Sequence, residues 1–206
     1  MITLVAINAR YSHSNLAVRC LRHALKEQGI KCDIIEKSIN DDMKTVLPIL
    51  YEKKSKYYGF SVYIWNKEYV YALAQDLKKL LPNCKIIFGG PEVSYDAYEV
   101  IKLDFVDYII TGEGEKPICE LLKNPDKEIN QVVTKQYDNT AFVPNKNLPF
   151  VYEKEDFKEL ENRIVYYESQ RGCPFRCSYC LSQNDRIITY KDKDEVIEDI
   201  IKLDKN

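Results

Sequence analysis

The sequence predicts an α/β protein whose core is a doubly wound parallel sheet of five strands. From the start to about residue 123, short apolar runs alternate five times with longer amphipathic stretches. Strands and helices that alternate in this way form a parallel sheet covered by helices on both faces. With 206 residues, the chain is long enough for one domain of ordinary size and part of another.

Each predicted strand is a short apolar run. The first run, ITLVAIN, has no basic region before it and no small-residue cleavage site after it. It is therefore interpreted as a strand and not as a signal peptide. The predicted strands cover residues 2–8, 31–37, 57–65, 84–90 (the fourth strand together with its turn) and 104–110.

The helices between these strands are predicted from apolar spacing and from the residues at their ends. In the first, apolar residues from Leu16 to Leu25 recur with an approximately helical period, and the segment stops at Gly29. Acidic residues suited to a helix N-terminus open the second, and Pro48 disturbs it. The predicted helices cover residues 15–29, 41–54, 66–81, about 94–102, and 115–123.

The character of the chain changes after residue 123. Short apolar patches, Asn and Asp turns and three prolines predict a small hairpin followed by an extended connector. Residues 163–172 are predicted as a new strand and residues 191–205 as a helix with one apolar side. We therefore divide the chain into residues 1–123, 124–162 and 163–206.

Composition narrows the classes of function. Hydrophobic residues make up 45% and charged residues 30%, the balance of a soluble globular protein. No apolar run approaches the roughly 18 residues of a membrane-spanning helix, so we expect a cytoplasmic protein without membrane contact. Thirty basic residues against 32 acidic ones argue against a nucleic-acid partner bound through its phosphates.

Three of the seven cysteines crowd into the stretch ESQRGCPFRCSYCLSQ, with the spacing C-x3-C-x2-C at Cys173, Cys177 and Cys180. Thiolates are soft ligands for iron–sulfur clusters, zinc and copper(I). A structural zinc site takes four ligands, whereas only three cysteines are local here and no histidine follows them. The interpretations are a zinc knuckle completed by a distant cysteine, three unrelated thiols, or a cluster that keeps one iron free of protein ligands.

The other four cysteines are scattered through predicted elements. With no export signal, we expect a reducing compartment in which they are packed free thiols. They are Cys20, Cys32, Cys84 and Cys119.

With Tyr179 directly before its last cysteine, the loop resembles the signature of the radical S-adenosylmethionine (radical SAM) superfamily. The resemblance implies that the three cysteines hold a 4Fe–4S cluster and that its open iron binds S-adenosylmethionine, with Tyr179 near the adenine. Reductive cleavage, with electrons from a donor, then gives a 5′-deoxyadenosyl radical. The resemblance also makes residues 163–172 the first strand of a (β/α) barrel.

A complete barrel of this kind takes on the order of 200–250 residues. From residue 163 the chain supplies one predicted strand, the cysteine loop and one helix. We therefore expect a fragment of a longer protein, inactive by itself, whose C-terminal helix leans on the first domain or on a neighbouring chain.

Glycines follow the fourth and fifth predicted strands, in the turns GGPE and TGEGE. Glycine lets a backbone approach a ligand closely, and sheets of this kind bind ligands at the carboxyl ends of their strands. Ahead of the cysteine loop, such a domain resembles the Rossmann-like or flavodoxin-like cobalamin-binding domain of cobalamin-dependent radical enzymes, over about residues 1–140. The opening NARYSHSNLAVRCL resembles the start of one uncharacterised subgroup of that family.

The resemblance implies a corrin site built from the strand-end loops. Many cobalamin domains carry D-x-H-x-x-G after the first strand, with a histidine that ligates cobalt, but this loop lacks the motif. We expect His13 to be a loop or surface histidine, and the lower face of cobalt to lack a protein imidazole. The candidate contacts are Tyr11, Ser12, His13, Ser61, Tyr63, Trp65, Gly89, Gly90, Pro91, Glu92, Gly112, Glu113 and Gly114.

Several of these residues have structural alternatives. In the competing interpretation, Tyr63 and Trp65 do not contact a corrin. They instead fill the core between sheet and helix, or pack against the second domain. Glu92 and Glu113 would then be acids that stabilise the N-termini of the following helices.

The leading hypothesis is the N-terminal part of a cobalamin-dependent radical SAM enzyme acting on a small-molecule or unknown substrate. The resemblance implies methyl transfer, or a radical rearrangement such as ring contraction or cyclisation. The alternative is a non-catalytic α/β module whose cobalamin site has decayed. A dinucleotide or flavin binder is disfavoured because NARYSHSN lacks G-x-G-x-x-G.

Overall fold

A seven-stranded sheet forms the centre of the computed structural model, which describes residues 1–175, 177–178, 180 and 187–205. Its strand order is β2-β1-β3-β4-β5-β6-β7, and the first five strands pair in parallel, which confirms the predicted α/β class. The five parallel strands are β1 (Ile2–Asn8), β2 (Cys32–Ser38), β3 (Tyr57–Ser61), β4 (Lys85–Gly89) and β5 (Tyr108–Ile110).

Two further strands extend the sheet beyond the predicted five. They are β6 (Val132–Val133) and β7 (Asp138–Asn139), and both pair antiparallel. They lie in the segment for which the sequence predicts a hairpin, and they cover the edge of β5.

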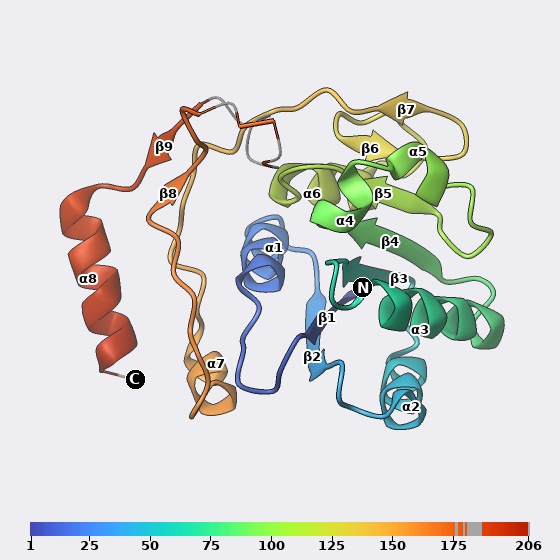
Figure 1. The fold of residues 1–206 in the computed structure, drawn as a ribbon, viewed down its shortest axis with the longest axis horizontal. Coiled ribbons are helices and arrows are strands. Elements are labelled where there is room, and N and C mark those ends of the chain that lie inside the picture. The colour runs from blue at the N-terminus through green and yellow to red at the C-terminus, as the bar shows by residue number, and fades with distance from the viewer. Residues whose placement is uncertain (176, 179, 181–186, 206) are drawn as a thin grey trace.

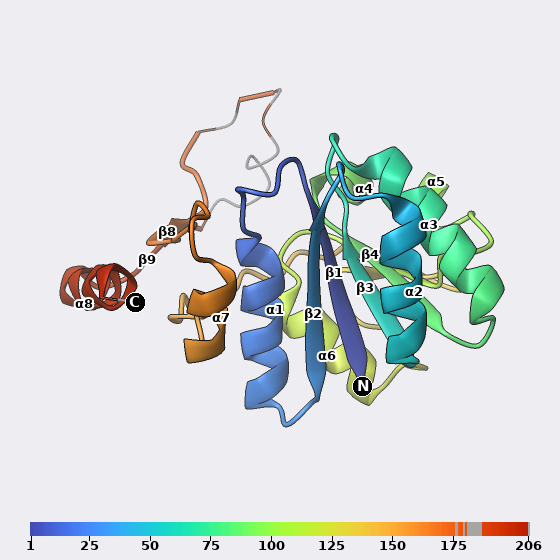
Figure 2. The ribbon, with the colours of Figure 1, turned by 90° about the horizontal axis from the view of Figure 1, so that it is seen from below.

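Helices cover both faces of the sheet, as Figures 1 and 2 show. On one face lie α1 (Leu16–Glu27) and α6 (Glu115–Lys123). On the other lie α2 (Met43–Lys53), α3 (Lys67–Leu80), α4 (Pro91–Ser94) and α5 (Ala97–Val100). The single helix predicted over 94–102 is wrong, because Asp96 leaves the helical region at φ −105° and ψ 29° and its carbonyl instead caps α5.

Strand β1 explains why the sequence shows a continuous apolar run. All seven of its residues are buried, with Leu4 in the core under α1 and α6 and Val5 in the core under α2 and α3. Side chains alternate between the two faces of a strand, so a strand covered on both sides must be apolar on both. The buried Thr3 hydroxyl is satisfied by Ser55 Oγ at 2.7 Å.

The chain after β7 runs along the outer side of α1 (Figures 1 and 2). It includes α7 (Lys154–Glu159), which the sequence analysis missed because six residues are too few to show an apolar period. Next come β8 (Gln170–Arg171), the cysteine loop, β9 (Thr189–Tyr190) and α8 (Lys193–Asp204).

The strand predicted over 163–172 is much shorter in the structure. Ile164 forms one isolated bridge with His13, and only β8 continues as a strand, pairing antiparallel with β9. The hydrogen bonds between β8 and β9 close the base of the cysteine loop. The start of a barrel stays a prediction.

Helix α8 lies at the margin of the molecule, outside α7 and α1 (Figures 1 and 2). Leu203 packs against the small core formed by Val151, Tyr152 and Leu160. The predicted apolar side is largely uncovered, since Ile200 is 52% exposed.

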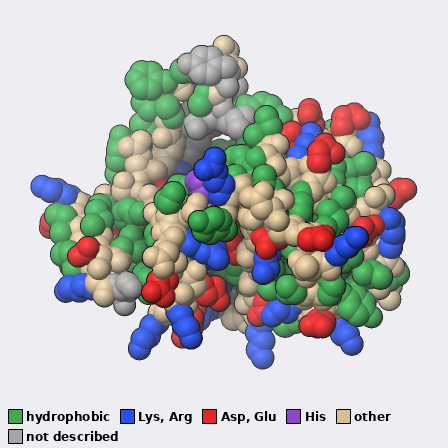
Figure 3. Space-filling view, turned by 60° about the horizontal axis from the view of Figure 1, so that its bottom comes forward, with side chains coloured by type: hydrophobic (Ala, Val, Ile, Leu, Met, Phe, Trp, Pro, Cys, Tyr) green, Lys and Arg blue, Asp and Glu red, His purple; other side chains and the backbone are tan. Residues whose placement is uncertain are grey.

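Charge is mixed over the surface. On the face shown in Figure 3, basic and acidic side chains are intermingled, in keeping with a net charge of −2. In the described part of the chain, no helix combines the length and apolar character that a membrane crossing requires.

Candidate functional site

The five parallel strands all end at one edge of the sheet, the upper edge in Figure 2. The described residues that follow β8 project on the same side. The strand ends, loops and first helical turn at this edge carry all the candidate corrin contacts, namely Tyr11, Ser12, His13, Ser61, Tyr63, Trp65, Gly89, Gly90, Pro91, Glu92, Gly112, Glu113 and Gly114.

The buried side chain of Asn66 organises the loop after β3. Its amide nitrogen donates to the carbonyl of Ile7 at 2.8 Å and to that of Ser61 at 3.0 Å. Its oxygen accepts from the Tyr63 backbone N–H at 2.8 Å. One amide thus ties the ends of β1 and β3 together, which is why β3 stops at Ser61 instead of continuing to residue 65 as predicted.

The Asn66 loop presents an aromatic pair at the edge. The rings of Tyr63 and Trp65 stack with centroids 4.5 Å apart and planes 6° from parallel. Trp65 is 47% exposed and therefore does not fill the core between sheet and helix. Burial raises the pKa of the Tyr63 hydroxyl, so it stays protonated at neutral pH.

The turn after β4 brings two backbones very close together. Val62 N–H donates to the Gly89 carbonyl at 2.7 Å, and Gly90 has φ +106°. A Cβ atom on Gly90 would lie 2.5 Å from the Val62 carbonyl oxygen. Only glycine fits both the dihedral angle and the space.

Replacing Gly90 by alanine is therefore expected to lower the free energy of unfolding by about 2–3 kcal/mol. The matched control is Gly89→Ala, whose Cβ would meet the Ile110 carbonyl oxygen at an ordinary 3.6 Å and should change stability by less than about 1 kcal/mol. Urea denaturation of both variants measures the difference. Equal losses would contradict the close approach at Gly90.

Glu92 is paired, which bears on the alternative that it is only a helix-end acid. It lies in the first turn of α4, and its carboxylate accepts from Lys67 Nζ at 2.9 Å. The hydrogen bond to Glu92 raises the pKa of Lys67. Glu92 therefore joins the β4 turn to the start of α3.

The turn after β5 is held by Gln131, a residue that the sequence analysis missed. Its side-chain N–H donates to the carbonyls of Thr111 at 2.8 Å and Glu113 at 3.0 Å. The Glu113 carboxylate accepts from the Asn145 backbone N–H. Gly112, at φ +66°, is exposed between them.

The loop after β1 is bridged by a later part of the chain. Ile164 N–H donates to the Ser12 carbonyl at 2.7 Å, and Ser14 Oγ donates back to the Ile164 carbonyl at 2.7 Å. His13 Nδ1 is hydrogen-bonded to the Tyr166 hydroxyl at 2.6 Å, and the two rings stack. The Nδ1 atom of His13 is therefore already hydrogen-bonded within the protein. Tyr11, in the same loop, is 77% exposed.

The three clustered cysteines are half-buried, with Cys180 N–H donating to the Cys177 carbonyl at 2.9 Å. Across the described residues, no three His, Cys, Asp or Glu side chains are gathered in a metal-binding arrangement. The structure therefore does not itself bring Cys173, Cys177 and Cys180 together, although three thiolates suit an iron–sulfur cluster chemically. Tyr179 lies outside the described residues.

The other four cysteines are free thiols inside the fold, as the sequence predicts. Burial raises the pKa of Cys20 and of Cys32 to about 12 and that of Cys119 to about 11, and it also raises the pKa of Cys84. Thiols with such pKa values stay protonated at neutral pH and make poor ligands.

A cavity of about 340 Å³ lies between α1, α6 and residues 145–152 and 167–171. Its wall includes Arg171 together with Glu115 and Glu168. None of the candidate corrin contacts lines it, so it is separate from the strand-end edge.

The chain is similar to a known protein family and to several individual proteins. The family described as "B12 binding domain" matches residues 2–122. The cobalamin-dependent radical SAM methyltransferase TokK of Streptomyces tokunonensis is 28% identical over 144 residues, which are 59% of this chain and 21% of that protein. The anaerobic magnesium-protoporphyrin IX monomethyl ester cyclase of Cereibacter sphaeroides is 23% identical over 159 residues, 65% of this chain and 26% of that protein.

Two solved structures share the fold. The cobalamin-dependent S-adenosylmethionine radical enzyme OxsB, with aqua-cobalamin and S-adenosylmethionine bound, superposes with a TM-score of 0.79 at 20% identity, over 97% of this chain and 31% of that one. The radical S-adenosylmethionine methyltransferase TsrM from Kitasatospora setae gives 0.69 at 16% identity, over 98% and 45%. The chain spans only 21–30% of the length of the curated relatives it matches.

Proposed function

This chain belongs to the B12-binding domain family, and from that premise we propose that its strand-end loops bind cobalamin within a cobalamin-dependent radical SAM enzyme. The observation that carries the proposal is the stacked Tyr63–Trp65 pair, held by Asn66 at the carboxyl edge of the sheet. A corrin is large and flat, and an aromatic pair at such an edge, with the Trp65 ring exposed, offers it a wall.

A buried hydroxyl group at this edge also fits a ligand with an amide rim. Ser61 Oγ, at the last residue of β3, is buried and lacks a hydrogen-bond partner among the described residues. Buried polar groups are normally satisfied, and a corrin side chain has amides that could complete this one. The exposed backbone at Gly112 adds a further polar group.

The proposal includes cobalt without a protein imidazole. The loop after β1 lacks D-x-H-x-x-G, and the His13 ring nitrogen Nδ1 is bonded to Tyr166 while residues 12–14 are bridged to Ile164. The absence of the motif also supports the second candidate, a module whose corrin site has decayed.

We further propose that Cys173, Cys177 and Cys180 hold a 4Fe–4S cluster and that Tyr179 packs near the adenine of S-adenosylmethionine. The support is the C-x3-C-x2-C spacing and the soft character of three thiolates. Once loaded, the cluster supplies the electron for reductive cleavage of S-adenosylmethionine. The chain spans a minor part of its relatives. Methyl transfer or a radical rearrangement is therefore proposed as the activity of an enzyme that contains this chain, and not of this chain by itself.

Retention of hydroxocobalamin tests the corrin site. Protein mixed with hydroxocobalamin and desalted should keep about one corrin per chain by absorbance, and Trp65→Ala should weaken binding about ten-fold, which corresponds to ~1.4 kcal/mol. Tyr51→Ala is the control, because Tyr51 lies in the last turn of α2, and that helix ends at the edge of the sheet opposite to the strand-end loops (Figure 2). A colourless wild-type fraction would favour the decayed module.

A further inference from the structure

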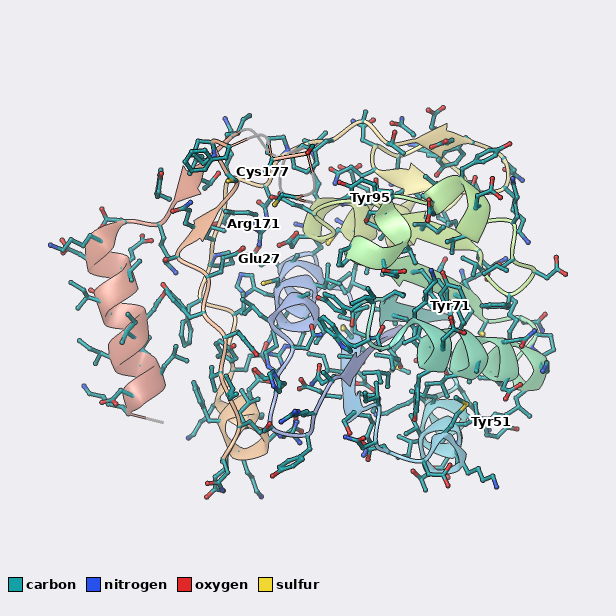
Figure 4. The ribbon with its side chains drawn as sticks, viewed as in Figure 1. Glu27, Tyr51, Tyr71, Tyr95, Arg171 and Cys177 are labelled. Carbon is teal, nitrogen blue, oxygen red and sulfur yellow. The ribbon has the colours of Figure 1, made fainter. Side chains whose placement is uncertain are left out.

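We infer that Arg171 is a positioning residue that fastens the base of the cysteine loop to the β5–α6 turn and thereby couples the two cofactor sites. The inference rests on the proposed function. It concerns a residue in neither set of candidate ligands, located where β8 meets α6 (Figure 4).

Arg171 lies among three carboxylates. Its Nη2 and Nε atoms both donate to the Glu168 carboxylate, at 2.6 Å and 3.2 Å. Its Nη1 atom lies 2.8 Å from Glu115 and 3.6 Å from Glu113. The Arg171 side chain is 15% exposed, and those of Glu113 and Glu115 are 12% and 13% exposed, so solvent screens these charges little.

On one side, Arg171 controls the base of the cysteine loop. It pairs with Thr189 in the two-residue ladder that closes the loop. The next residue, Gly172, has φ +90°, and a Cβ atom there would lie 2.3 Å from the Ile187 carbonyl oxygen. With the backbones packed this closely, the place of Arg171 determines the place of Gly172 and, after it, Cys173.

On the other side, Arg171 reaches the loop proposed to contact cobalamin. Glu113 belongs to the TGEGE turn, and its backbone carbonyl and carboxylate are held by Gln131 and Asn145. Glu115 is the first residue of α6. A shift of the cysteine loop would therefore pull directly on this turn.

The positive charge of Arg171 holds carboxylates of the β5–α6 turn and of the segment before the cysteine loop close together. Without the guanidinium, three largely buried carboxylates would repel one another, and the turn and the loop would separate. Because binding energies couple reciprocally, binding of a cluster by Cys173, Cys177 and Cys180 should raise the affinity for cobalamin, and cobalamin should raise the affinity for the cluster.

Hydrogen exchange on the cofactor-free full chain tests the positioning role. Arg171→Met should raise amide exchange at least about ten-fold in both residues 111–115 and residues 170–173. The matched control is Lys191→Met, which removes a buried cation paired with Asp199 within the C-terminal segment and should leave residues 111–115 unchanged. Unchanged exchange in Arg171→Met, or equal changes in the two variants, would overturn the inference whether or not cobalamin binds.

A binding measurement tests the coupling. Anaerobic reconstitution of the wild type with iron and sulfide should raise its affinity for hydroxocobalamin at least about five-fold. In Arg171→Met this ratio should fall to about one, while Arg171→Lys should keep part of it. A wild-type ratio of one overturns the coupling. A wild type that retains no hydroxocobalamin at all overturns the proposed function and the coupling with it.

Discussion

Replacing Asp156 by alanine should lower the free energy of unfolding by about 3–5 kcal/mol, because it removes the shared anion of the buried Arg19 and the half-buried Arg22. Asp156 is 3% exposed. Arg22 donates to it at 2.9 Å, and the Nε atom of Arg19 lies 3.4 Å away. Arg19 itself is 1% exposed and reaches Glu36 of β2 at 2.9 Å.

The same carboxylate also caps α7, since it accepts from the Glu153 backbone N–H at 2.7 Å. The substitution thus removes the ion pair between Asp156 and Arg22 and also the hydrogen bond that caps the start of α7. The segment that carries Ile164, which bridges the loop after β1, loses its ion pairs from Asp156 to the arginines of α1. Urea denaturation followed by circular dichroism measures the loss.

Glu99→Ala is the control for Asp156→Ala. Glu99 forms an exposed ion pair with Lys102 one turn along the chain, and such pairs contribute less than about 1 kcal/mol. If Asp156→Ala cost no more than Glu99→Ala, the anchoring role of α7 would be wrong.

The stability difference between wild type and Asp156→Ala should also depend on pH. Burial by itself raises the pKa of Asp156, but hydrogen bonds from Arg22 and the Glu153 backbone and the nearby positive charges outweigh it and hold the pKa below its ordinary value. A depressed carboxyl pKa stabilises the fold above the unfolded value of about 3.9 and stops doing so as pH falls through the folded value. The two proteins should therefore differ fully at pH 7 and progressively less below about pH 4.

Substituting alanine at Cys173, Cys177 or Cys180 should abolish iron binding. Anaerobic reconstitution of the wild type is expected to give roughly four irons per chain, as a 4Fe–4S cluster requires. Each single substitution removes a third of the protein ligands, so the iron content should fall close to zero. Iron and sulfide analysis, together with the absorbance of the cluster, measures the result.

Cys32→Ala provides the matched control for the cluster. Burial raises the pKa of Cys32 to about 12, so this thiol stays protonated and should not contribute a ligand. The variant should keep the full iron content. A wild type that instead binds one zinc with a fourth protein ligand would contradict the cluster.

Much of the fold follows from local patterns in the sequence. The run from Ile2 to Asn8 is apolar on both faces, and that alone indicates a central strand of a parallel sheet. The strand-end loops follow from the same alternation, because parallel strands end at one edge. The cysteine spacing is equally local, and it required no tertiary information.

Two errors in the predicted element bounds come from single residues. The Asn66 side chain stops β3 four residues early by binding backbone groups of β1 and β3. At Asp96 the backbone leaves the helical region and divides a predicted helix into two. From the sequence, a tryptophan at position 65 is equally compatible with the core and with the edge of the sheet. In the structure, the loop held by Asn66 places Trp65 at the edge.

The sequence by itself therefore determined the five parallel strands, the longer helices that cover them and the edge where a ligand would bind, since these depend on periodicities of two and 3.6 residues. Only the tertiary structure decided which polar residues hold that edge. Arg171 meets Glu113 and Glu115, and Arg22 meets Asp156, across more than fifty residues of chain. A hydrogen bond or ion pair between such distant residues leaves no periodic trace, because its geometry exists only after the elements have packed.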